Sequence, residues 1–368
     1  MLSDVRAPRL RLVANGQLVP GAIEAEVVSN NHYAADRFRA ALAIGPSGAA
    51  AWAAADQLEV EIAVSIDGPR GFVPLVGGLV DTVEIDPVAN TVSVTGRDRT
   101  ALLIEARTQE SFPNRTASEI AALLAGRHGL RADVVATTTP VGRYWEGERT
   151  RLSLGEFARA TTEWDLLVAL ARQEGFDVWV AGDTLHFRPP QTRPGAEAAL
   201  RAVAVRGRPA NVTALRLQRS LTLARDIEVV VKSWNAQRRT AFTQTARARR
   251  RQGERRGPVQ RYVYIVPNLT EGEALALAQR KLAELTRHER VITADMPGEL
   301  NLAPRMMLRL EGTRTGFDQD YWIDEIVRHV DIRRGFTQRL RAKNASVDSQ
   351  ATAPADPAQT KDVAWTDS

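Results

Sequence analysis

Residues 161–190 constrain the fold of this chain more than any other segment. Apolar residues between Trp164 and Ala171 recur at spacings of three and four, which places them on one face of a helix. Gly175 follows as a typical helix stop. From residue 176 to 187, apolar and polar residues alternate on both sides of Gly182-Asp183, and two prolines then prevent further strand pairing. The segment therefore predicts a packed helix and a hairpin with a defined end, which α/β domains of many kinds contain.

Strand patterns fill the first hundred residues and return after Pro190. Short alternating segments separated by turn residues, as in 58–64 and 79–94, are typical of a barrel or a sandwich. A hydroxyl residue followed three positions later by glutamate is the capping box of a helix start, and it occurs at Thr116, Ser153 and Thr270. The chain is therefore predicted to be β, then mixed, then mostly β.

The exact residue sequence of several segments is more specific for a protein family than the spacing of their apolar residues. Residues 161–190 read Trp-Asp-Leu-Leu, then Ala-Arg-Gln-Glu-Gly-Phe, then a hairpin that closes on Thr-Leu-His-Phe-Arg-Pro-Pro. This resembles the central part of phage tail baseplate hub proteins, the late-control gpD-like family, which is related to the hub part of type VI secretion VgrG spike proteins. Four further segments follow in the family's order and extend the resemblance over about residues 75–343. They are Val92–Asp98 with Ala101–Leu103, Pro267–Ala274, Met296–Gly298 and Gly316–Ile323.

The resemblance implies an α+β fold that is mostly β. Two tube-like β-barrel domains would have an α/β domain inserted between them. The expected boundaries are 1–105 for the first barrel domain, 106–190 for the mixed α/β domain, and 191–344 for the second barrel domain. That second domain would carry one helix and an arginine-rich loop at 236–261, and a polar, flexible tail would follow at 345–368.

Positive charge is concentrated in residues 236–261. This segment holds nine arginines and one glutamate, a net charge of +8, so that the rest of the +5 chain carries −3. The run could contact an acidic protein or nucleic-acid phosphates, or it could be a solvated loop between two strands. Because buried like charges repel, we expect an exposed or partner-facing loop. The candidate partner-binding residues are Arg247, Arg249, Arg250, Arg251, Arg255 and Arg256.

From about Ala345 the chain is polar and shows no periodicity, a composition that cannot bury enough apolar surface to order itself. We therefore expect the tail to be dispensable for folding. Trp365 is either an anchor for a partner or incidental.

No motif for catalysis, cofactor binding or metal binding stands out, and we predict a protein that is not an enzyme. The five histidines are scattered, and the absence of cysteine excludes disulfides, thiolate catalysis and cysteine-ligated metals. Glu163 and Asp165 are the acids to nominate for a tail-tip enzyme such as a peptidoglycan hydrolase, the alternative function. Both are better explained as helix N-terminal charges. The sequence contains no apolar run long enough to span a bilayer.

The resemblance implies a structural baseplate hub of a phage tail or phage-derived particle. Three copies would join the hexameric tail tube to the central spike and enclose a channel for genome or effector delivery. One chain with two similar faces lets a threefold object present six near-equivalent contacts. The expected partners are two further copies in a homotrimer, the tail tube or tube-initiator protein, a separate trimeric spike protein and the tape-measure protein. DNA would pass without specific binding, and the hub would reside in the virion after assembly in the bacterial host cytoplasm.

Overall fold

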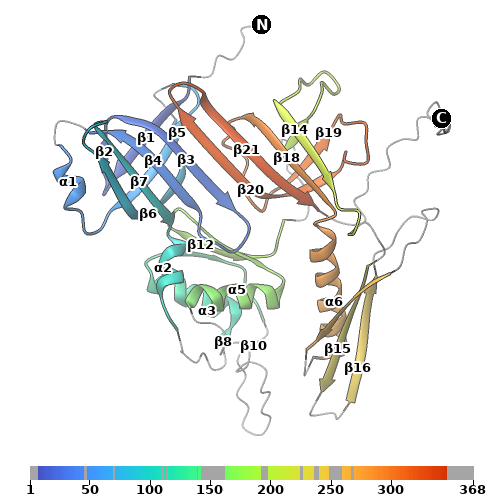
Figure 1. Ribbon diagram of the computed structural model, residues 1–368. Coiled ribbons are helices and arrows are strands. Elements are labelled where there is room, and N and C mark those ends of the chain that lie inside the picture. The colour runs from blue at the N-terminus through green and yellow to red at the C-terminus, as the bar shows by residue number, and fades with distance from the viewer. Residues whose placement is uncertain are drawn as a thin grey trace, which may run out of the picture.

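The computed structural model describes residues 7–44, 48–68, 71–108, 112, 115–138, 140–141, 162–191, 198–223, 227–235, 240–247, 259–266 and 269–345. The fold is mostly β, and its largest element is a 13-stranded, mainly antiparallel sheet (Figure 1). This sheet takes strands from the first hundred residues and from residues 199–344. They are β1 (Arg9–Ala14), β2 (Gln17–Val19), β3 (Ala22–Asn30), β4 (Arg37–Ala43), β5 (Glu59–Ser65), β6 (Val73–Asp86), β7 (Thr91–Asp98), β13 (Ala199–Arg201), β14 (Ala214–Arg219), β18 (Arg290–Pro297), β19 (Met307–Glu311), β20 (Asp320–Asp331) and β21 (Gly335–Asn344).

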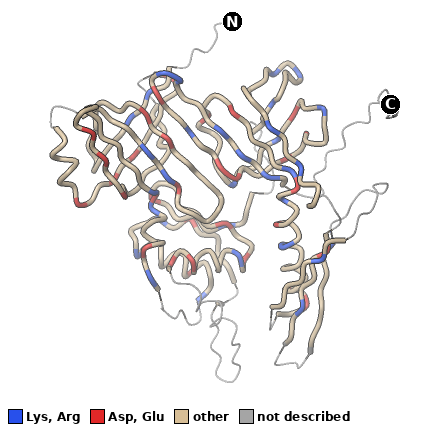
Figure 2. The backbone as a smooth tube through the Cα atoms, viewed as in Figure 1, with Lys and Arg blue, Asp and Glu red and all other residues tan. Residues whose placement is uncertain are grey.

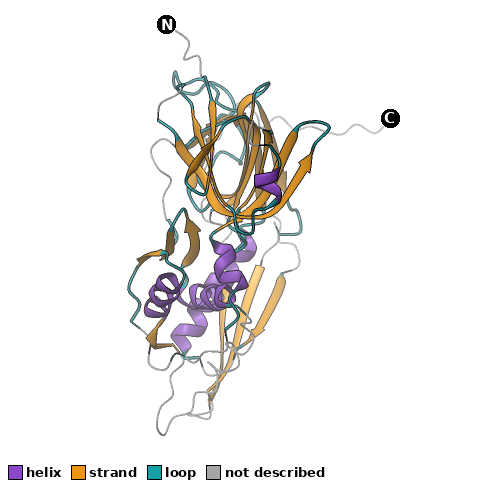
Figure 3. Cartoon of the chain, turned by 90° about the vertical axis from the view of Figure 1, so that its left-hand side faces the viewer, coloured by secondary structure: helices purple, strands orange, loops and turns teal. Residues whose placement is uncertain are grey.

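Strands β3 and β20 pair antiparallel and join the two halves of the large sheet. The order is β14-β18-β21-β20-β3-β4-β7-β6-β5-β1-β2, so β20, β21, β18 and β14 lie on one side of this seam and β3, β4, β7 and β6 on the other. Viewed along its edge, the sheet is curved (Figure 3). The hydrogen-bonded path through the described strands is open at β14 and β2, so it does not itself form the closed barrels expected from the sequence.

Alternation of apolar and charged residues explains why these strands pair with one face inward. In β4, Phe38 and Ala40 are buried, whereas Arg37 and Arg39 are exposed. In β21, Leu340 and Ala342 are buried while their neighbours are basic. Period-two burial of this kind fixes the register, because a slip of one residue would turn the apolar set toward solvent.

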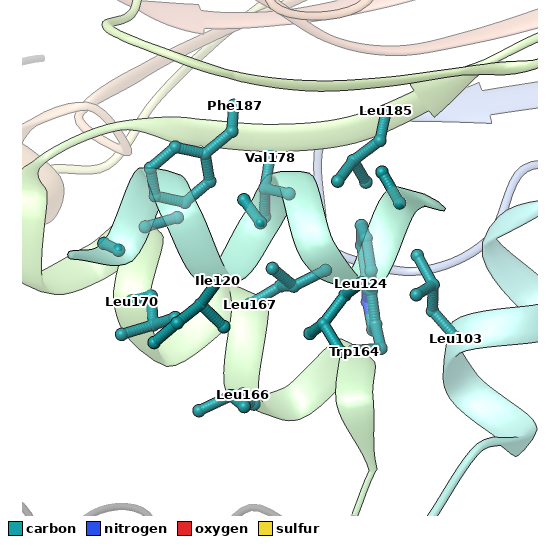
Figure 4. Close-up of a cluster of buried hydrophobic side chains, with 14 of the residues drawn as sticks. Leu103, Ile120, Leu124, Trp164, Leu166, Leu167, Leu170, Val178, Leu185 and Phe187 are labelled. Carbon is teal, nitrogen blue, oxygen red and sulfur yellow. The ribbon is translucent and has the colours of Figure 1, made fainter. Parts of the chain in front are cut away.

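The middle of the chain forms a helical layer below the large sheet (Figure 1). Its helices pack against a three-stranded sheet around Leu124, Trp164, Leu167 and Phe187 (Figure 4). The elements are α2 (Thr100–Glu105), β8 (Arg115–Thr116), α3 (Ala117–Arg127), β9 (Arg131–Val134), β10 (Pro140–Val141), α5 (Glu163–Glu174), β11 (Asp177–Ala181) and β12 (Thr184–Arg188). A short helix, α1 (Ala50–Ala53), precedes β5 in the first part of the chain.

The helix and hairpin predicted from residues 161–190 are confirmed. α5 ends at Gly175, which has a left-handed φ of 73°, and β11 pairs with β12 across Gly182-Asp183. The capping boxes at Thr116 and Thr270 are also confirmed. Ser153 lies outside the described residues.

A small sheet and one helix form a third unit, which lies beside the helical layer (Figure 1). Strands β15 (Ile227–Asn235), β16 (Thr240–Arg247) and β17 (Gln260–Ile265) form their own sheet in the order β16-β15-β17, and α6 (Glu271–Thr286) covers one face of it. The sequence interpretation had placed these elements within the second barrel domain. They separate because Ile227, Val229 and Val231 find their core with α6 rather than with the large sheet.

The interpretation of residues 236–261 as a loop is wrong for residues 240–247, which form β16, and for residues 260–261, which begin β17. Phe242 and Ala246 turn toward α6, while Thr243 and Thr245 point outward. This period of two is typical of a half-buried strand, but Gln244 occupies one of the inward positions, so the alternation of apolar and polar residues in β16 is incomplete.

Candidate functional site

The two acids nominated for catalysis both have structural partners. The carboxylate of Glu163 is buried between Arg127 and His128, and its Oε2 lies 2.6 Å from His128 Nε2. Asp165 accepts a hydrogen bond from Thr162 N at 3.2 Å, while its own N–H donates to Thr162 Oγ1 at 3.1 Å. Glu163 is thus more than the helix N-terminal charge that the sequence indicated, since it ties α5 to α3.

A groove of about 660 Å³ lies between the large sheet and the helical layer, with Tyr33, Trp164 and Asp165 in its walls. Arg97, also in its wall, is held by Asp81 and Glu105, each at 2.6 Å. The charged groups named here are therefore already engaged within the chain. In the part of the chain that is described, no three metal-ligating side chains gather, and no helix is long and apolar enough to cross a membrane.

A buried polar cluster fastens the three parts of the chain together. The guanidinium group of Arg305 donates to the carbonyl oxygen of Asn30 at 2.8 Å and lies 4.8 Å from the ring centroid of Trp179 in β11. Asn30 N donates in turn to Asp36 Oδ1 at 2.9 Å. Residues from the second half of the large sheet, from its first half and from the hairpin therefore meet at one point.

Asp98 extends this cluster to α2. Its carboxylate accepts hydrogen bonds from Thr100 N at 3.1 Å and from Thr100 Oγ1 at 3.0 Å. Burial, and then the neighbouring charge of Asp36, raises the pKa of Asp98 to about 8. Burial also raises the pKa of Asp36 and lowers the pKa of Arg305. The cluster fixes the arrangement of these elements, and sequence reasoning missed it because its members lie far apart in the chain.

Of the predicted partner-binding residues, the structure describes Arg247, at the end of β16. It shares the carboxylate of Glu228 with Arg261: Arg247 donates to Oε1 at 2.6 Å, and Arg261 donates to Oε2 at 2.7 Å. Arg261 and Arg247 hold the pKa of Glu228 below its ordinary value. Glu228 lies near the start of β15 and Arg247 is the last residue of β16, so these charges gather at one end of the small sheet; Figure 2 marks the charged residues along the backbone. Arg249, Arg250, Arg251, Arg255, Arg256 and Trp365 lie outside the described residues.

The face of the small sheet opposite α6 is apolar and uncovered by any described cluster. We call it the open face. On it, Trp234, Val263 and Ile265 are 51%, 48% and 79% exposed. The strand register makes them neighbours, since Val263 lies beside Val230 and Ile265 lies beside Lys232. The open face consists of Lys232, Trp234, Thr243, Thr245, Val263 and Ile265, which surround the buried Val230.

Large exposed apolar side chains in adjoining positions are typical of an interaction surface. The sequence contained a signal for it, since β17 reads as an alternating strand with aliphatic residues on one face and tyrosines on the other. Which of those two faces α6 covers could not be read from that pattern.

No family model and no curated protein matches this sequence. Its fold is similar to that of the tail protein from Neisseria meningitidis MC58, with a TM-score of 0.67 and 13% identity over 94% of this chain and 99% of that chain. It is similar to the prophage MuSo2 43 kDa tail protein from Shewanella oneidensis, with a TM-score of 0.67 and 15% identity over 94% of this chain and 100% of that one.

A further likeness is to a chain of a Francisella PdpA–VgrG complex, with a TM-score of 0.52 and 9% identity over 93% of this chain and 59% of that chain. At these identities the likenesses show a shared fold. This fold is found in two phage-type tail proteins and in a chain of a PdpA–VgrG complex.

Proposed function

We propose that this chain is a structural hub of a phage tail or phage-derived particle. The observation that carries the proposal is the likeness of fold to two tail proteins over nearly the full length of all three chains. A likeness confined to one part would fit an added domain of some other protein. Because the likeness instead extends over nearly the whole of each chain, it favours a tail role for the entire chain.

The pairing order of the large sheet supports two similar halves. On each side of the β3–β20 seam lies a hairpin, β3–β4 or β20–β21, followed by β7 and β6 on one side and by β18 and β14 on the other. We propose that residues 1–105 and 191–344 each supply one tube-like barrel domain, and that 106–190 is inserted between them. Three such chains would offer six similar faces to a hexameric tube and threefold symmetry to a spike.

In this proposal the homotrimer encloses a channel and contacts the tail tube or its initiator, a separate trimeric spike protein and the tape-measure protein. The finished hub resides in the virion after assembly in the bacterial host cytoplasm. The small sheet with α6 stands away from the large sheet, which suits a lateral contact rather than a place in the ring (Figure 1).

The alternative, a tail-tip peptidoglycan hydrolase, would need an acid in a cleft with its charge available to the substrate. Glu163 and Asp165 are engaged elsewhere, so we predict that the purified chain does not release products from cell-wall peptidoglycan. Release of soluble fragments can be followed by chromatography. Turnover that disappears in Glu163→Gln or Asp165→Asn would overturn the structural role.

We propose that the arginine segment contacts an acidic neighbour in the assembled tail. Replacement of Arg249, Arg250 and Arg251 by Ser should leave the chain folded and weaken tip assembly, with a difference from the parent that is largest at low salt and shrinks as salt is added. Arg247 stays unchanged, because it neutralises Glu228. A variant that assembles normally but fails to deliver its genome would point to a DNA-guiding surface. A variant equal to the parent in both assembly and delivery would show that the segment is a solvated loop.

A further inference from the structure

The open face borders a row of three charged residues on the same side of the small sheet. The strand register places Arg247 and Arg261 on either side of Glu228, and both donate to its carboxylate, at 2.6 Å and 2.7 Å. The two arginine side chains are 73% and 63% exposed. Because one carboxylate neutralises only one of the two guanidinium groups, the row presents an unbalanced positive charge and further N–H donors to solvent.

Lys232 adds a second positive charge at the centre of the open face. It lies between Thr243 and Ile265 in the strand register, and Trp234 follows two positions along β15 on the same side. Among the described residues, none forms an ion pair or a side-chain hydrogen bond with the ammonium group of Lys232. A partner that covered the apolar side chains without supplying a carboxylate would leave this charge buried and unpaired, which strongly opposes binding.

The charges on this side of the sheet disfavour a second copy of the chain as the occupant. The four charged residues there carry a net charge of +2; they are Lys232, Arg247, Arg261 and Glu228. Two copies packed face to face would bring two positive surfaces together. Single-stranded nucleic acid also fits poorly, because the most exposed side chain, Ile265 at 79%, offers no ring on which a base could stack. A protein segment that combines apolar side chains with carboxylates satisfies both the charge and the apolar surface.

Strand geometry sets the distance between the two positive sites. Lys232 lies four residues beyond Glu228 in β15, which at about 3.3 Å per residue is roughly 13 Å. Two turns of an α-helix rise about 11 Å, and the reach of the side chains makes up the difference. The other face of the same sheet already carries a helix, since α6 packs on it through Ala274, Ala278 and Leu282. A second helix on the open face would complete an arrangement of helix, sheet and helix.

We propose that the open face binds an amphipathic helix of another protein that carries carboxylates two helical turns apart. One carboxylate pairs with Lys232 and the other with Arg247 and Arg261, while apolar residues between them pack on Trp234 and Ile265. The surface lies outside the large sheet, so this inference goes beyond the proposed hub and holds whether or not three copies form a ring.

The first test is a selection from a displayed library of random peptides of about sixteen residues, enough for about four helical turns. The target is the immobilised full chain. Peptides selected on the parent should bind the variant Trp234→Ser with Ile265→Ser at least roughly tenfold more weakly. They should also carry acidic residues about seven positions apart, which is two helical turns. Ile332→Ser is the matched control, because Ile332 is 82% exposed in the β20–β21 turn, and it should leave binding unchanged.

The second test assigns a carboxylate to Lys232. A synthetic peptide of the selected sequence is compared with peptides in which each acid in turn is replaced by its amide. Fluorescence anisotropy measures binding to the parent and to Lys232→Met. One of the replacements should weaken binding to the parent by roughly tenfold and should have little effect on Lys232→Met. Added salt should reduce the difference between the acidic and the amide peptide. All variants should melt like the parent, because the substituted side chains are exposed.

Three outcomes would overturn the proposal. The selection could give no peptide that depends on Trp234 and Ile265, or the selected peptides could lack acidic residues. Acid replacements with equal effects on the parent and on Lys232→Met would likewise exclude the pairing. A single-stranded oligonucleotide that binds the parent more tightly than the selected peptide, and that the substitutions of Trp234 and Ile265 release, would assign the open face to nucleic acid instead.

Discussion

Asp98 shows how a single buried carboxyl group can determine local structure in this chain. It accepts two hydrogen bonds from Thr100, the first residue of α2, and accompanies Asp36 in the cluster that Arg305 joins to the hairpin. The Gly-Arg-Asp turn was visible in the sequence as part of a family pattern. The sequence did not show that Asp98 would be buried beside a second carboxyl group. Asp36 directly precedes β4, and only the pairing of β4 with β7 brings the two residues together.

The raised pKa of Asp98 predicts a pH dependence of stability. The ordinary pKa is 3.8 and the folded value is about 8, so between these values the folded chain retains a proton that the unfolded chain has lost. Stability therefore falls as pH rises from about 4 to about 8. In Asp98→Asn the thermal midpoint should fall less steeply over this range, as measured by calorimetry at several pH values. A slope equal to that of the parent would exclude Asp98 as its source.

Arg247 shows at the same scale what a count of charges leaves open. It is exposed at the end of β16, and its partner Glu228 is 19 residues away and becomes its neighbour only through the β15–β16 register. Sequence charge counts predict where basic residues gather, and they do not show which of them are neutralised.

Among the elements, those with strong local signals were predicted. The hairpin β11–β12, the helix α5 and the capped starts of α3 and α6 each have a turn, a stop or a cap within a few residues. Strands β3, β4 and β18 were missed. The alternation in β3 and β4 depends in part on small residues such as Ala25 and Ala40, which are weak strand formers, and β18 begins with three consecutive buried residues, which interrupt the period of two.

The contact between β6 and β7 depends on glycine. A Cβ atom at Gly96 would lie 2.1 Å from the carbonyl oxygen of Leu79 and 2.5 Å from the Phe38 ring. Gly96→Ala should therefore destabilise the chain by about 1–3 kcal/mol. Gly126→Ala is the matched control: no atom lies within 4 Å of its Cβ in helix α3, and it should stabilise by about 0.5–1 kcal/mol. Chemical denaturation of both variants gives the comparison, and equal effects would contradict this account of the strand contact.

At the scale of the whole molecule, the seam between β3 and β20 is the central feature. It makes one continuous sheet from two parts of the chain that lie almost 300 residues apart, and the helical layer is inserted between those parts in sequence. The order β, mixed, β was predicted from local patterns. The β3–β20 seam was not predicted, because pairing between strands far apart in the chain produces no pattern in the nearby sequence. The separate sheet of β15–β17 was not predicted for the same reason.

The copy number at the tail tip tests the proposed hub most directly. Cryo-electron microscopy of purified particles that carry the chain should show three copies around a central channel, between the tube and the spike, with the β3–β20 seam intact in each copy. Two, four or six copies, or a position away from the tube–spike junction, would contradict the proposal.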